Sequence, residues 1–224
     1  MKSKIYGFVV FFILISIGYI LKRKNIWRLN RSVNFTIEYN NNFVELLKYI
    51  YEKNYFDNEK YMWLTEKVDM MQRELGKIGI IGHYFDPLKG LKIENYELLI
   101  NFLPETRSYM RELNSSIMME RFDKSANLCV DMFLRHKGKL EEQINKENMM
   151  LFNPFSCLAE AVRYVIALPF NILYWFGIIP EKVLYRIESS SLLKVVNAII
   201  ILIGFVSSIF TILLGWKEFL NIFQ

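Results

Sequence analysis

Two long runs without a charged side chain constrain this sequence more than any other feature. Val195 to Trp216 contains no ionisable acid, base or histidine and is bounded by Lys194 and Lys217. Ile5 to Leu21 is a second uncharged run, 17 residues long. A helix that crosses a bilayer needs about 20 predominantly apolar residues, with a range of about 17–25. Both runs therefore predict membrane-spanning helices, which makes this an integral membrane protein.

The basic residues near the N-terminus predict the orientation of the first helix. Lys2 and Lys4 precede the apolar run, and five basic residues follow it: Lys22, Arg23, Lys24, Arg28 and Arg31. The positive-inside rule places this membrane-surface basic cluster in the cytoplasm and the N-terminus outside. Ser16 and Gly18 could form a signal-peptide cleavage site. The apolar run continues past Gly18 into the basic cluster, which favours an uncleaved anchor.

A second membrane segment is predicted near residues 161–179, with an uncharged stretch at Tyr164–Ile179. Sixteen residues with Pro169 among them could form a short kinked span, extended upstream through Leu158. The same stretch could form a re-entrant or interfacial helix. A span would place the following loop outside, whereas a re-entrant segment would keep it in the cytoplasm. We favour three spans.

The last apolar run carries a stripe of small and polar residues at alternating four- and three-residue steps. Its members are Asn197, Gly204, Ser208, Thr211 and Gly215. This spacing places them on one face of a helix, and polar groups in a membrane normally face protein or water. The stripe could pack against other helices of the same chain. It could instead form a homo-oligomeric seam that lines a pore.

The middle of the chain is polar and predicts a cytoplasmic helical domain over residues 32–155. It contains sixteen basic and nineteen acidic residues. Residues 1–31 form the anchor and basic juxtamembrane segment, and residues 156–224 form the C-terminal membrane region. The predicted fold class is all-α, with about three transmembrane helices and a cytoplasmic helical bundle. No alternating pattern longer than four residues predicts a strand.

Local signals predict several boundaries in this domain. Asn40, Asn41 and Asn42 are candidate caps, Asp57 is a candidate N-cap, and Gly76 is expected to end the helix that Asp57 starts. A glycine-rich loop is expected to follow as far as Gly90. A long helix is predicted from about Ser115 to about Gly138, and Asn153-Pro154-Phe155 is a turn signal at the membrane surface.

The sequence carries no motif that predicts catalysis, a metal or a cofactor. Gly76, Gly79 and Gly82 lack the preceding strand and the Lys-Ser or Lys-Thr of a phosphate loop, so a structural turn is favoured. His83, His136, Cys129 and Cys157 do not have ligand spacing. Cys157 lies at the membrane boundary, where it could be acylated, but a buried thiol is favoured. We expect a protein that is not an enzyme.

Apolar side chains at the boundary between domain and membrane predict a possible gate. Met149, Met150 and Phe152 lie just before the second membrane segment. This is where a hydrophobic constriction or a gating linkage would be placed.

The order of segments resembles that of bacterial anti-phage membrane effectors, in which a few membrane helices join a cytosolic sensing domain. The resemblance implies a homo-oligomeric effector or ion channel in the inner membrane, opened by a cytosolic ligand or protein partner. The basic excess lies beside an apolar run rather than on the folded domain, which argues against a nucleic-acid partner and indicates the lipid bilayer. The alternative is a membrane-anchored scaffold or adaptor that recruits a cytoplasmic protein.

Overall fold

The computed structural model describes residues 2–53, 55–86, 90–109 and 116–180, together with residues 183, 203, 204 and 207. The chain divides into two compact units. The terminal unit comprises residues 1–26 and 146–224, and the central unit comprises residues 27–145. Helices α1 and α4 each have residues in both units.

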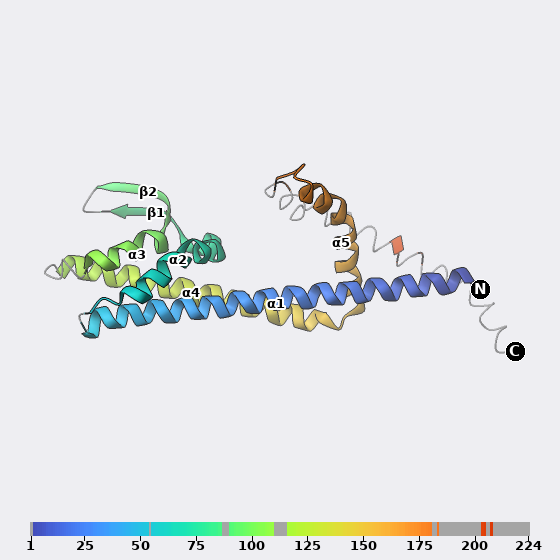
Figure 1. The fold of residues 1–224 in the computed structure, drawn as a ribbon, viewed down its shortest axis with the longest axis horizontal. Coiled ribbons are helices and arrows are strands. Elements are labelled where there is room, and N and C mark those ends of the chain that lie inside the picture. The colour runs from blue at the N-terminus through green and yellow to red at the C-terminus, as the bar shows by residue number, and fades with distance from the viewer. Residues whose placement is uncertain are drawn as a thin grey trace. The chain divides into compact units, whose positions relative to one another are not determined.

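Five α-helices dominate the described residues (Figure 1). They are α1 (Lys2–Lys53), α2 (Asn58–Leu75), α3 (Leu98–Tyr109), α4 (Ser116–Leu151) and α5 (Pro154–Trp175). A short 3₁₀ helix, η1 (Gly76–Gly79), follows α2. The predicted helical character is confirmed.

The prediction of a glycine-rich loop is wrong, because a β-hairpin occupies this part of the mostly helical chain. Strands β1 (Ile80–Asp86) and β2 (Leu91–Glu97) pair antiparallel, with Ile81 opposite Tyr96 and Tyr84 opposite Ile93. Gly82 interrupts the alternation of apolar and polar residues in β1. The polar residues of β2 likewise leave no alternation in the sequence from which a strand could be predicted. The hairpin is held partly by the stacked rings of Tyr84 and Tyr96, whose centroids lie 4.2 Å apart.

Two predicted helix boundaries are also wrong. Helix α1 continues through Asn40–Asn42, where the Asn42 side chain donates to the Glu38 carbonyl instead of capping a new helix. Helix α4 continues through Gly138 to Leu151. An interior glycine weakens a helix by only about 1 kcal/mol, and tertiary packing routinely overrides such a preference. Fully buried Tyr39 and Phe43 flank the asparagines and supply that packing in α1.

The core of the central unit lies among α1, α2, α3 and α4. The rings of Tyr39 and Phe43 on α1 both lie 5.5 Å from that of Phe133 on α4. The Phe43 ring lies 5.9 Å from that of Phe102 on α3. The Tyr39 hydroxyl donates to the Leu64 carbonyl of α2 over 3.0 Å, so this buried polar group is satisfied. An aromatic cluster thus joins all four helices.

The predicted N-cap and C-terminal residue of α2 are confirmed. The Asp57 side chain accepts a hydrogen bond from the Lys60 amide over 3.1 Å, as an N-cap does. Gly76 ends the helix with φ of 53°, a conformation that favours glycine. Leu64, Met71 and Leu75 form the buried face of this helix.

A buried histidine connects three helices of the central unit. His136 on α4 is buried, and its Nε2 lies 3.9 Å from Oε2 of Glu74 on α2. The same carboxylate oxygen accepts a hydrogen bond from Ser32 on α1 over 2.9 Å. His136 Nε2 makes no hydrogen bond with a described residue. Burial lowers the pKa of His136, the Glu74 carboxylate partly opposes this change, and Lys139 adds to it.

We expect the central unit to lose stability as the pH falls below about 6.5, the ordinary pKa of histidine. The folded state holds His136 neutral, whereas the unfolded chain takes up a proton near that pH, so acid favours unfolding. One such group changes the free energy of unfolding by at most about 1.4 kcal/mol per pH unit. The urea unfolding midpoint of the full chain in detergent, followed by tryptophan fluorescence, measures the slope.

His136→Gln should flatten the pH dependence between about pH 7.5 and 5.5. His83→Gln is the matched control, because His83 is exposed on the hairpin. If the pH dependence of stability disappeared in His83→Gln, or persisted in His136→Gln, its assignment to His136 would be wrong.

Candidate functional site

The predicted turn at Asn153-Pro154-Phe155 joins the end of α4 to the start of α5. The Asn153 side chain accepts from the amides of Phe155 and Ser156, over 3.0 and 3.3 Å, and caps α5. Pro154 occupies the first helical turn, where its missing N–H costs nothing. The buried Cys157 thiol donates to the Leu151 carbonyl over 3.2 Å. This turn is therefore short and held by hydrogen bonds at both ends.

Helix α5 begins ten residues before the predicted stretch at Tyr164 and contains 22 residues. At about 1.5 Å per residue it spans about 33 Å, enough to cross a hydrocarbon core of about 30 Å. Among the described residues, this is the one helix whose length and composition would allow a crossing. It continues through Pro169, and the Asn171 side chain donates to the Ala167 carbonyl. The helix therefore begins upstream of Leu158, and its crossing of a membrane stays a prediction.

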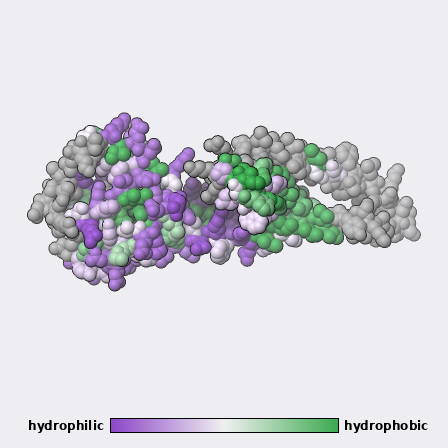
Figure 2. All heavy atoms as spheres, turned by 45° about the horizontal axis from the view of Figure 1, so that its top comes forward, coloured by the Kyte–Doolittle hydropathy of each residue, from purple (hydrophilic) through white to green (hydrophobic). Residues whose placement is uncertain are grey.

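Few apolar side chains of α5 are buried, and half of them are exposed. Val165, Leu168, Ile172 and Trp175 are all accessible, and Trp175 is 82% exposed. Figure 2 shows hydrophobic residues gathered over α5 and over the N-terminal part of α1, and hydrophilic residues over much of the central unit. Exposed apolar patches of this kind are typical of surfaces that contact another protein or a membrane.

Within the terminal unit, α1 and α5 cross in backbone contact at Gly18. A Cβ atom built on Gly18 would overlap the backbone carbonyl of Cys157. Cys157 and Ala161 lie one turn apart on the same face of α5, and both are buried. Small residues allow this close approach of two helices. Sequence reasoning noted Gly18 only as part of a cleavage signal and missed this role.

An ion pair lies one helical turn beyond this crossing. Lys22 Nζ on α1 lies 2.9 Å from Oε2 of Glu147 near the end of α4, and the Asn25 amide lies 3.5 Å from Oε1. The Lys22 side chain is 6% exposed and that of Glu147 is 29% exposed. Lys22 was predicted to belong to a membrane-surface basic cluster, but its charge is directed inward. The remaining four members are exposed: Arg23, Lys24, Arg28 and Arg31.

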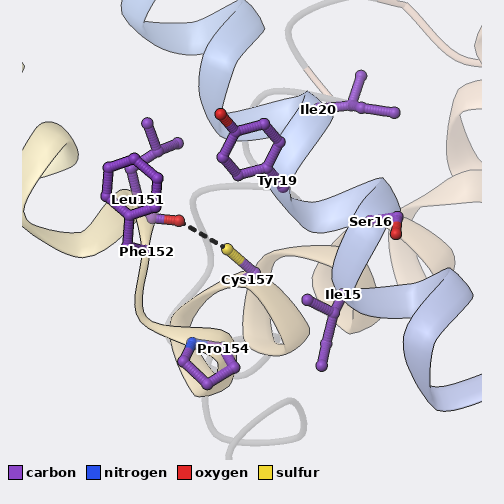
Figure 3. A pocket seen from close by; sticks show the side chains of 8 residues that line it. All are labelled: Ile15, Ser16, Tyr19, Ile20, Leu151, Phe152, Pro154 and Cys157. Carbon is purple, nitrogen blue, oxygen red and sulfur yellow. Dashed lines mark hydrogen bonds between the residues drawn. The ribbon is translucent and has the colours of Figure 1, made fainter.

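A mainly apolar groove of about 430 Å³ lies in the terminal unit where α1, the end of α4 and the start of α5 come together (Figure 3). Its walls are formed by Ile15, Ser16, Tyr19, Ile20, Leu151, Phe152, Pro154 and Cys157. The rings of Tyr19 and Phe152 lie 6.4 Å apart at one side of it. The Ser16 hydroxyl donates to the Phe12 carbonyl of its own helix. The groove is thus mainly apolar, and the hydroxyl of Ser16 is satisfied within its own helix.

The predicted gate residues are all at this junction, but the structure separates their roles. Phe152 lines the groove and contacts Tyr19. Met149 and Met150 are exposed and do not belong to the groove lining. Gating by these residues stays a prediction.

The predicted seam is described at a single position. Gly204 is exposed, and a Cβ atom there would meet nothing within 4 Å. Asn197, Ser208, Thr211 and Gly215 lie outside the described residues. The seam stays a prediction from the sequence.

Chemical sites are sparse in the described part of the chain, where no cluster of three His, Cys, Asp or Glu could hold a metal ion. Comparisons of the chain with protein families, curated proteins and solved structures found no match. The features of the terminal unit that could serve a function are those of the junction: the Gly18 crossing, the Lys22–Glu147 pair and the groove.

We expect Gly18→Ala to separate α1 from α5, because the added methyl group must displace the Cys157 backbone. Overpacking of this kind costs about 1–3 kcal/mol. Alkylation of Cys157 by a maleimide should accelerate by roughly tenfold or more, since about 1.4 kcal/mol corresponds to a factor of ten. Peptide mass spectrometry distinguishes Cys157 from Cys129.

Gly138→Ala is the matched control, because a Cβ atom at this helical position meets nothing within 4 Å. It should leave the alkylation of Cys157 unchanged. Equal behaviour of the two variants would show that α1 and α5 do not meet at Gly18.

We also expect Glu147→Gln to destabilise the junction by roughly 1–3 kcal/mol, because it leaves the buried Lys22 ammonium without its charged partner. The reciprocal pair Lys22→Glu with Glu147→Lys should recover part of the loss. The thermal unfolding midpoint in detergent measures both effects. Glu141→Gln, which breaks the exposed Lys137–Glu141 pair, should change stability by less than about 0.5 kcal/mol. Equal losses in Glu147→Gln and Glu141→Gln would contradict a structural role for the buried pair.

Proposed function

We propose that this chain is a homo-oligomeric effector or ion channel of the inner membrane, whose cytoplasmic helical domain controls membrane permeability. The single observation that carries the proposal is the α4–α5 junction. A helix that packs in the central unit turns, through one hydrogen-bonded cap, directly into the exposed apolar helix α5. Because this turn is short and capped, a displacement of α4 would also displace α5. A flexible linker would instead let α4 move without α5.

The membrane placement is supported by three apolar segments. Helix α5 has the length and composition of a span. Ile5–Leu21 and Val195–Trp216 are uncharged in the sequence. The exposed Arg23 and Lys24 follow the first of these, which supports a cytoplasmic central unit by the positive-inside rule.

The pore is proposed from the stripe on the last apolar run. Asn197, Ser208 and Thr211 would form polar rings when copies of the chain assemble with this face inward. The central unit would bind a cytosolic ligand or a partner protein that moves α4. The order of segments suits the anti-phage membrane effectors that it resembles, which permeabilise the inner membrane.

The test is the current across a planar bilayer that contains the purified chain, together with its mass in detergent. We expect an oligomer with discrete conductance steps. Asn197→Leu or Ser208→Leu should alter the conductance or the oligomeric state, because each removes a polar group from the seam. Ser207→Leu is the matched control, since Ser207 is off the stripe.

A silent monomer would contradict the channel and favour a membrane-anchored scaffold or adaptor. If neither Asn197→Leu nor Ser208→Leu changed conductance or mass, the seam assignment would be wrong.

A further inference from the structure

From the groove in the terminal unit we infer that the chain binds an anionic phospholipid of the bilayer. One acyl chain would lie in the groove, and Arg23 and Lys24 would hold the phosphate. This inference rests on the membrane placement in the proposed function, but it does not depend on the pore.

The shape and lining of the groove suit a hydrocarbon chain. Its volume of about 430 Å³ is within the range of small-molecule sites. Figure 3 shows Ile15 and Ile20 of α1 on one side, with Leu151 and Phe152 across from Tyr19. The Ser16 hydroxyl is already bonded to the Phe12 carbonyl, so it does not require a polar ligand. An open apolar concavity at membrane depth is filled by lipid rather than water, because water there would lack hydrogen-bond partners.

The charges beside the groove select an anionic headgroup. Arg23 lies four residues after Tyr19, and Lys24 lies four residues after Ile20, so both cations continue the helix face that lines the groove. Both are exposed, and neither has an ion pair with a described residue. From Ile15 to Arg23 the helix rises about 12 Å, which places the cations at one end of the groove.

The Lys22–Glu147 pair strengthens this selection. Glu147 lies beside this part of α1, and its charge is compensated by Lys22 over 2.9 Å. Arg23 and Lys24 therefore present a net positive charge. Basic side chains attract anionic lipids at a membrane surface, and each further cation strengthens the attraction. A zwitterionic lipid would gain less from the same two cations.

The test is native mass spectrometry of the full chain released from nanodiscs of equal parts phosphatidylglycerol and phosphatidylcholine. We expect phosphatidylglycerol to be retained in preference to phosphatidylcholine. Ser16→Phe should abolish the retention by filling the groove. Arg23→Gln with Lys24→Gln should reduce it by roughly tenfold or more, since each cation contributes to headgroup affinity.

Two control variants match these changes. Ile13→Phe adds a ring to an exposed position of α1 that is not part of the groove. Lys124→Gln with Arg135→Gln removes two exposed charges from the central unit. Both should retain phosphatidylglycerol as the unchanged chain does. The charge variant also keeps the test decisive if Ser16→Phe does not fold.

Each other outcome overturns the lipid site. Equal retention of the two lipids, or retention that survives Ser16→Phe, would exclude it. A loss of oligomer mass rather than of lipid in Ser16→Phe would make the groove an interface between copies. A chain that enters nanodiscs without lipid preference leaves the proposed membrane function intact, whereas a chain that does not enter them contradicts both.

Discussion

The approach of Gly18 to the Cys157 backbone is the constraint on which the described contacts among α1, α4 and α5 in the terminal unit depend. With no side chain at residue 18, the first turn of α5 lies directly on α1. That contact forms the groove, because Leu151 and Phe152 precede α5 by only a few residues and are brought beside Tyr19. The buried Lys22–Glu147 pair then fixes the end of α4 one turn further along α1. A larger residue at position 18 would alter all of these distances together.

Sequence patterns predicted the features whose causes are local. The Asp57 cap and the Gly76 terminus of α2 follow from side-chain oxygen geometry and from a positive φ, and both are found. The turn at Asn153-Pro154 is likewise a short-range signal. The glycine loop failed as a prediction because strand pairing depends on the opposite strand. Neither β1 nor β2 shows clear alternation by itself, yet they pair over their length.

The candidate site could be located from the sequence but not assembled from it. The boundary residues near Phe152 and the basic cluster were identified, because apolar and charged runs are visible in one dimension. The partner of Lys22 was not, since Glu147 is 125 residues away and lies among other charged residues of similar appearance. Gly18 is one small residue in an apolar run. Its importance appears only when the Cys157 backbone is beside it.

The division of the basic cluster has a physical consequence for a helix at a membrane surface. A buried cation is tolerated when a carboxylate and further hydrogen bonds compensate for its lost hydration, as Glu147 does for Lys22. Its neighbours Arg23 and Lys24 are exposed and keep their hydration. One turn of α1 therefore holds the end of α4 through Lys22, and in the proposed membrane placement it would present Arg23 and Lys24 to the lipid headgroups. In the proposed effector, a change on the Lys22 side of this turn, or on the side of Arg23 and Lys24, would alter the packing at the α4–α5 junction.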